Sequence, residues 1–292
     1  MSLTPLPEMN EQPLDIQHDP DPAHEVPPGR RIPHLGHALL FFSVATFSVL
    51  LCSVFALVAV HASANEPAMK HPIAAAVGQL AGYAVTLAIA IPLFPIAWNC
   101  TFWQGIHWNW RSARRNAWKL LLTGVLLSLG AQLSERFIKA PDSLDLLELF
   151  RTPLSAWLTA IIGSFVPALM EEISFRGFLL PALATAYDWL ALERTPAAVE
   201  RWSRTTDNST PAWLFGSILS SIAFALLHAG QLHNARGPLL VLFCVSLVLC
   251  LVRIRTRSVA AATLVHMAYD SLIFAEMCFA TGGFRHLDRL LQ

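Results

Sequence analysis

Charged residues are scarce in this sequence. Asp, Glu, Lys and Arg make up 14% of the 292 residues, whereas 54% are hydrophobic. A water-soluble domain needs more polar surface than this, so the composition points to the lipid bilayer as the solvent. The 20 basic and 20 acidic residues give a net charge of zero, which leaves no excess positive charge for binding nucleic acid. We therefore predict an integral membrane protein.

Cysteine is also sparse, and its spacing excludes some kinds of site. The five cysteines stand singly, without a CxxC pair, and are read as small buried hydrophobic residues. The first 36 residues hold six acids and several prolines but no apolar stretch, unlike a cleaved signal peptide. We expect residues 1–36 to be a disordered cytoplasmic tail and residues 37–292 to be the membrane domain.

Apolar segments long enough to span a bilayer, about 20 residues as a helix, recur from residue 37 onward. Such segments are predicted to be helices, because open strands leave backbone groups unpaired in lipid. An amphipathic stretch at 143–150 is expected to lie in the interface. The fold class predicted is all-α, a polytopic transmembrane bundle of seven to eight helices around an intramembrane polar site. The seven apolar segments cover residues 38–60, 72–97, 117–133, 153–184, 211–229, 238–252 and 258–280.

The distribution of Lys and Arg predicts the orientation. With the N-terminus inside, twelve of these residues lie in the inner segments and seven in the outer ones. Because cytoplasmic loops carry the excess of positive charge, a cytoplasmic N-terminus is favoured. The short loops and small size are typical of a bacterial inner-membrane protein, with membrane lipid as its surroundings.

Acidic and basic residues inside apolar segments are the informative ones. A charge near the bilayer centre costs at least about 2.5 to 3.5 kcal/mol, so it persists only when paired, facing a cavity or functional. Glu172 and Arg176 are four residues apart on one helix face and are expected to form a structural ion pair. Glu171 points about 100° away around the helix, which leaves it free to act as a general base.

Two later segments each carry histidine at helical spacing from a second functional residue. Phe224 and His228 share one face of the fifth segment, and His266 and Asp270 share one face of the seventh. Peptide hydrolysis inside a bilayer needs a bound water, a base and a group that stabilises the oxyanion. One glutamate with two histidines supplies these roles.

Other interpretations use the same residues. A lone intramembrane histidine is more often a packing residue than a catalyst, and a Glu–Arg pair is often only a structural lock. A proton-coupled transporter could use these acids and histidines as a relay, and a non-catalytic immunity or scaffold protein could simply bury them. No two-fold symmetry of broken helices, as expected of a transporter, is visible in the sequence.

The three motifs in order resemble a known family. EExxxR matches Glu171, Glu172 and Arg176; FxxxH matches Phe224 and His228; HxxxN/D matches His266 and Asp270. This pattern, within residues 150–280, is similar to that of the CAAX protease and bacteriocin-processing (Abi) membrane proteases, which are related to the type II CAAX prenyl endopeptidases.

The resemblance implies an intramembrane protease acting on a membrane-associated or lipid-modified protein. By likeness, Glu171 activates the water with His228, His266 and Asp270 form the oxyanion side, and Glu172, Arg176 and Phe224 support the site. Many members carry Asn where this chain has Asp270, and an ionised Asp cannot donate a hydrogen bond. Either Asp270 is protonated, or it orients His266 or binds a metal.

Whether the site holds zinc is the other open alternative. No HExxH motif is present, so metal-free catalysis is favoured. If the enzyme is metal-dependent, the ligands would be Glu171, His228, His266 and Asp270. The predicted spans also leave Glu171 and His228 at different depths, unless helices tilt, break near Pro167, or begin at different levels.

Overall fold

The structure is a computed structural model that describes residues 31–63, 70–135, 137–138, 150 and 152–291. In this part of the chain all regular structure is helical, which confirms the predicted all-α class. The predicted tail up to residue 30 and the predicted interfacial helix up to residue 149 lie outside the described residues. The elements are α1 (Leu35–Ala59), α2 (Pro72–Trp98), α3 (Phe102–Gly105), α4 (Trp110–Arg115), α5 (Ala117–Glu135), α6 (Pro153–Glu172), the π-helix η4 (Ile173–Leu179), α7 (Leu180–Ala191), α8 (Pro196–Arg204), α9 (Thr210–Leu227), α10 (Arg236–Thr256), α11 (Val259–Ala280) and the 3₁₀-helix η5 (Leu287–Leu291).

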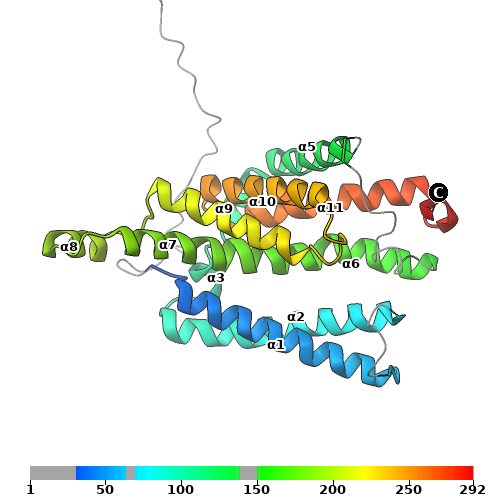
Figure 1. Ribbon diagram of the computed structural model, residues 1–292, viewed down its shortest axis with the longest axis horizontal. Helices are drawn as coiled ribbons and strands as arrows, with labels where there is room; N and C mark the ends of the chain where they lie inside the picture. The colour runs from blue at the N-terminus through cyan, green and yellow to red at the C-terminus, as the bar shows by residue number, and fades with distance from the viewer. Residues whose placement is uncertain (1–30, 64–69, 136, 139–149, 151, 292) are drawn as a thin grey trace, which may run out of the picture.

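Six of these helical stretches are long and apolar enough to cross a membrane. They are α1, α2, α5, the 39-residue run from α6 through α7, α9 and α10. The seventh predicted segment forms the 22-residue helix α11, which stands outside this set. His266, Asp270 and Glu276 make α11 more polar than its neighbours, yet it packs against α5, α6 and α10 within the bundle (Figure 1).

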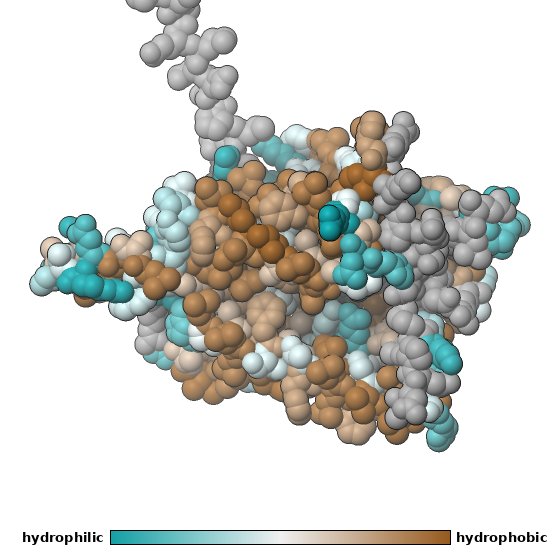
Figure 2. Space-filling view, viewed as in Figure 1, coloured by the Kyte–Doolittle hydropathy of each residue, from teal (hydrophilic) through white to brown (hydrophobic). Residues whose placement is uncertain are grey.

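The outer surface matches a lipid environment. Large hydrophobic side chains are exposed along α1, α5 and α9, for example Phe47 at 67% and Leu226 at 63%. Figure 2 shows hydrophobic residues across the face formed by α9, α1 and α2, whereas hydrophilic residues gather at the α8 end. Hydrophobic residues on this scale would not stay exposed to water.

Helices α1 and α2 form a close antiparallel pair. Gly78 and Gly82, four residues apart on α2, lie against the backbone of Ser53 and Val49 on α1, and a Cβ at either glycine would come within 2.5 Å of a Cα atom. Small residues at this spacing let two membrane helices approach closely. The pair joins the rest of the bundle through stacked aromatic rings, with Phe41 4.2 Å from Phe178 of η4.

The helix that carries the EExxxR motif is interrupted by a change of helix type rather than by a break. Pro167 lies inside α6, which continues to Glu172. From Ile173 to Leu179 the chain winds as a π-helix, and α7 then follows without a loop. A π-helical turn is wider than an α-turn, changes the direction of the side chains around it, and is frequent at functional sites.

The predicted difference in depth between Glu171 and His228 is removed by a stagger of the helices. Helix α9 packs against α7 and is displaced toward α8, so that its last turn lies beside the middle of the α6–α7 run (Figure 1). Gly216 permits this contact, because a Cβ there would lie 2.9 Å from the carbonyl oxygen of Leu180. Helices α6 and α9 thus begin at opposite ends of the bundle, and their C-terminal ends meet inside it.

Candidate active site

The ion pair predicted within the EExxxR motif is present and fully buried. Arg176 Nη1 donates to Glu172 Oε1 at 2.9 Å, and both side chains have no exposed surface. Arg176 Nη2 donates to the backbone oxygen and to Oγ of Ser246 on α10, at 3.0 and 2.8 Å. Its guanidinium also lies 4.9 Å from the centre of the Phe224 ring. The charge of Arg176 is therefore balanced by Glu172, and its guanidinium is held by residues of α6, α9 and α10.

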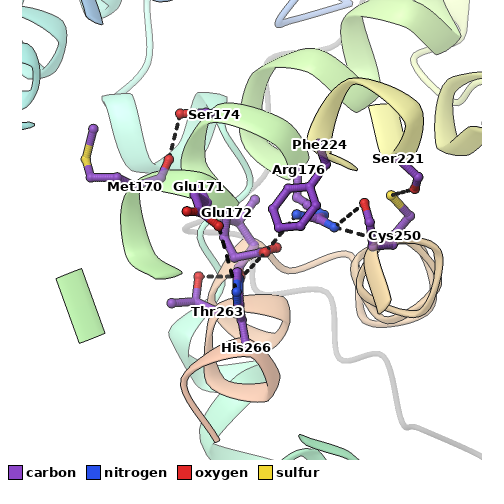
Figure 3. Close-up of polar contacts among 12 residues, drawn as sticks. Met170, Glu171, Glu172, Ser174, Arg176, Ser221, Phe224, Cys250, Thr263 and His266 are labelled. Atoms are coloured by element: carbon purple, nitrogen blue, oxygen red, sulfur yellow. Dashed lines mark hydrogen bonds and ion pairs between the residues drawn. The ribbon is translucent and has the colours of Figure 1, made fainter. Parts of the chain in front are cut away.

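Glu172 has a second partner that the spacing of the motif did not predict. His266 Nδ1 lies 2.8 Å from Glu172 Oε1, so the same oxygen that accepts from Arg176 also accepts from the imidazole (Figure 3). A carboxylate on one ring nitrogen fixes the orientation of a histidine and directs the other nitrogen elsewhere. Glu172 thus positions His266 as well as pairing with Arg176.

Glu171 occupies a different environment from Glu172. Its side chain is 18% exposed, whereas that of Glu172 is sealed from solvent. Glu171 Oε1 lies 3.7 Å from His228 Nε2, and Glu171 Oε2 lies 3.8 Å from His266 Nε2. These separations exceed a direct hydrogen bond and suit a bridging water. The Glu171 carboxylate therefore lies between two imidazoles, on the solvent-accessible side of the EExxxR motif.

His228 is held at the end of α9. It is the C-cap residue of that helix, and its Nδ1 lies 2.8 Å from the carbonyl oxygen of Phe224. Donation from Nδ1 to this carbonyl leaves Nε2 facing Glu171. The Phe224 ring lies 4.7 Å from the His228 ring and 6.0 Å from the His266 ring, so it fixes the spacing of the two histidines.

Asp270 completes the cluster from α11. Its Oδ2 lies 3.7 Å from His266 Nε2, and its side chain is 20% exposed. The carboxyl groups of Glu171 and Asp270 thus face Nε2 of His266, and that of Glu172 faces its Nδ1. All four predicted catalytic residues come together, and the three predicted supporting residues lie directly behind them.

Ser246 is the functional residue that the motifs did not include. It is the only serine or threonine within the apolar segment 238–252, and a lone hydroxyl there is the signal that could have found it. Its role is to hold Arg176, as described above. In the described residues no group of three or more His, Cys, Asp or Glu side chains is arranged to hold a metal ion. An open groove of about 630 Å³ at the end of α2 and around α3 is lined by none of the residues of the three motifs.

The chain also matches a known protein family over the part that holds this cluster. Residues 153–272 match the family model described as "Type II CAAX prenyl endopeptidase Rce1-like". Over that segment the chain is similar to the Rce1-like family. The match runs from the start of α6 to just beyond Asp270, so the Rce1-like segment contains every residue of the cluster. No curated protein and no solved structure matches the chain.

The Rce1-like match confirms the resemblance inferred from the three motifs. It supports a CAAX-type protease within the membrane that acts on a protein or peptide. Helices α1 to α5 precede the Rce1-like segment and shape its surroundings, since α1 and α2 contact η4 and α5 packs along α11.

Proposed function

We propose that the chain is an intramembrane endopeptidase that hydrolyses a peptide bond of a membrane-associated or lipid-modified protein. The observation that carries the proposal is the position of Glu171, whose two carboxylate oxygens each face a histidine Nε2 at water-bridging distance. A glutamate with a solvent-accessible face and a histidine beside it can remove a proton from water.

In this mechanism Glu171 and His228 deprotonate a water held between them. The water oxygen attacks the carbonyl carbon of the scissile bond, and Glu171 takes the proton. His266 stabilises the oxyanion through Nε2–H, because Glu172 accepts from its Nδ1 and keeps the ring in place. The proton then passes to the leaving nitrogen as the C–N bond breaks, which regenerates the carboxylate. Glu172 and Arg176 remain a buried support.

This mechanism is metal-free, and metal removal tests it. We expect purified protein treated with chelator to keep its activity, and metal analysis to find no stoichiometric zinc. Stoichiometric zinc whose removal abolishes cleavage would establish Glu171, His228, His266 and Asp270 as ligands instead.

The experiment uses purified full-length protein with a farnesylated peptide ending in a C-a-a-X sequence, and the same peptide without the lipid. We expect Glu171→Gln and His228→Ala to lose activity by at least about 100-fold, the usual contribution of a general base. Glu276→Gln is the matched control, since Glu276 also lies on an apolar helix but outside the cluster. Equal cleavage by the Glu171→Gln and parent proteins would disprove the assignment, and proton flux without proteolysis would favour a transporter.

Asp270 is assigned to the oxyanion side next to His266. A side-chain amide donates a hydrogen bond at any pH, whereas a carboxyl group donates only when protonated. We therefore expect Asp270→Asn to retain activity and to hold it at alkaline pH better than the parent, while Asp270→Ala loses it. If Asp270→Asn is as inactive as the alanine variant, the carboxylate itself is required.

A further inference from the structure

Arg253 is a buried cation for which the proposed reaction has no use. It lies near the end of α10 and is 3% exposed. Its Nε has no hydrogen-bond partner among the described residues, and the guanidinium forms no ion pair with a carboxylate in that part of the chain. Arg176, the other buried arginine among the described residues, is balanced by Glu172. Burying an unpaired charge is costly, so a missing anion is expected.

The chain around Arg253 supplies no acid. Residues 99–119, which include α3 and α4, contain no Asp or Glu, and neither do residues 236–269. Asp207 pairs with Arg257 of the α10–α11 turn, with its Oδ2 3.7 Å from Arg257 Nη2, and both side chains are more than half exposed. The acid therefore balances the surface arginine and not the buried one.

The loop between α3 and α4 is fastened over the turn between α10 and α11. Val259 N donates to the backbone oxygen of His107 at 3.0 Å, and Ser258 Oγ donates to that of Asn109 at 2.7 Å. Ser112 Oγ adds a bond to the backbone oxygen of Thr256. Arg253 is thus a buried residue of α10 close to His107 of this loop. Burial, with added repulsion from Arg253 and Arg257, lowers the pKa of His107 to about 3.

The position of Arg253 along its helix points to the membrane interface. The apolar span of α10 ends at Thr256, three residues beyond Arg253. Neighbouring α4 and the start of α5 carry Trp110 and Trp118, which are 55% and 66% exposed, the positions typical of interfacial anchors. The basic residues of α4, of the start of α5 and of the end of α10 with the turn after it are Arg111, Arg114, Arg115, Lys119, Arg253, Arg255 and Arg257.

From these observations we infer that Arg253 is the centre of a binding site for the phosphate of an anionic phospholipid headgroup, between α10 and the α3–α4 loop. A guanidinium binds phosphate through two parallel hydrogen bonds, and a phosphodiester brings the single negative charge that one buried arginine lacks. Basic pockets between membrane helices bind such headgroups. The exposed tryptophans and apolar helix faces beside the site would contact the acyl chains.

The test measures thermal unfolding of full-length protein in micelles containing phosphatidylglycerol or only phosphatidylcholine. We expect phosphatidylglycerol to raise the unfolding midpoint of the parent and to bind Arg253→Gln about 10-fold to 100-fold more weakly, the loss expected for hydrogen bonds to a charged group. Arg255→Gln is the matched control, because it removes the same charge from an exposed position two residues away.

A reversal of order between phosphatidylglycerol and a phosphate-free detergent gives a sharper readout. In maltoside micelles without phospholipid, Arg253→Gln should be at least as stable as the parent, because the variant buries no unpaired charge. In phosphatidylglycerol the parent should be the more stable. Phosphatidylglycerol should also remain bound to the parent through purification, as detected by mass spectrometry, which needs no variant.

Four results would overturn the inference. One is equal stabilisation of the parent by the two lipids, and another is equal loss of response in the Arg253 and Arg255 variants, which would indicate only diffuse surface charge. Full stabilisation by inorganic phosphate or glycerol phosphate at the same concentration would assign the site to a free phosphate. Stabilisation by a peptide with a free C-terminal carboxylate, lost in Arg253→Gln, would assign it to a peptide.

Discussion

Single residues in this protein divide by their access to water. Glu171 and Glu172 are neighbours in sequence, yet one is 18% exposed between two histidines and the other is sealed against Arg176. A sealed carboxylate that accepts two charge-assisted hydrogen bonds is fixed in place, whereas a partly exposed one can exchange protons with water. Under the proposed mechanism the two adjacent acids take a supporting and a reactive role, because they differ in burial and in partners.

His107 gives a residue-scale prediction on pH. Its pKa is lowered to about 3 by burial and by nearby arginines. Between pH 6.5 and 3 the unfolded chain therefore binds a proton that the folded chain does not, so this histidine makes stability fall as pH falls through that window. We expect His107→Asn to lose less stability than the parent between pH 7 and pH 5, measured by thermal unfolding.

The choice of asparagine keeps the backbone of His107 unstrained. His107 has a φ of 58°, and Asn accepts this conformation better than most residues. His61→Asn is the control, because His61 has a φ of 55° but an exposed side chain. An unchanged pH response in His107→Asn would show that the buried imidazole does not contribute.

At the scale of elements, close helix contacts hold α11, which carries His266 and Asp270, in place. Gly124 on α5 lies against α11, where a Cβ would come 2.4 Å from the carbonyl oxygen of Val265 and 2.6 Å from Cβ of Ala268. Val265 precedes His266 in the sequence. A side chain at position 124 would push α11 away from α5. The position of His266 therefore depends on glycine at position 124.

Gly124→Ala and Gly130→Ala form a matched pair on the same helix. We expect Gly124→Ala to destabilise the protein by about 1–3 kcal/mol through overpacking and to reduce activity, since α11 carries His266. Gly130 has nothing within 4 Å of a built Cβ, so Gly130→Ala should be neutral or stabilising by up to about 1 kcal/mol. Thermal unfolding and peptide cleavage measure the two effects, and equal behaviour of the variants would contradict the packing argument.

The elements show which features the sequence could predict. Apolar length predicted the segments that became α1, α2, α5, α9, α10 and α11 to within a few residues. The i, i+4 spacing predicted the Glu172–Arg176 pair, because that contact lies within one helix. The contact of Glu172 with His266 joins residues 94 positions apart and depends on how α6 and α11 pack. The π-helix η4 was not predicted either, because its sequence shares the apolar character of the α-helices on each side.

On the scale of the whole molecule, the bundle keeps the cluster of Glu171, His228, His266 and Asp270 away from both ends. Glu171 follows 18 residues of α6, and His228 follows 18 residues of α9, from opposite ends of the bundle. The ends of α6 and α9 meet because α9 is displaced along α7. Glu171, His228 and Asp270 are partly exposed at this depth. Such a position suits a lipid-attached substrate whose scissile peptide bond reaches the cluster from within the membrane.

The positions of the termini give the last prediction. In Figure 1 α1 begins at the end of the bundle that holds α3 and α8, and the chain ends at the opposite end. The basic residues of α4 and of the α10–α11 turn lie at the α1 start, which predicts a cytoplasmic N-terminus. If α11 crosses the bilayer despite its polar residues, alkaline phosphatase fused after Gln292 will be active outside the cytoplasm, and the same reporter fused after Arg257 will be inactive. An inactive C-terminal fusion, with the protein stably inserted, would show that α11 enters the membrane without crossing it, because six spans return the chain to its starting side.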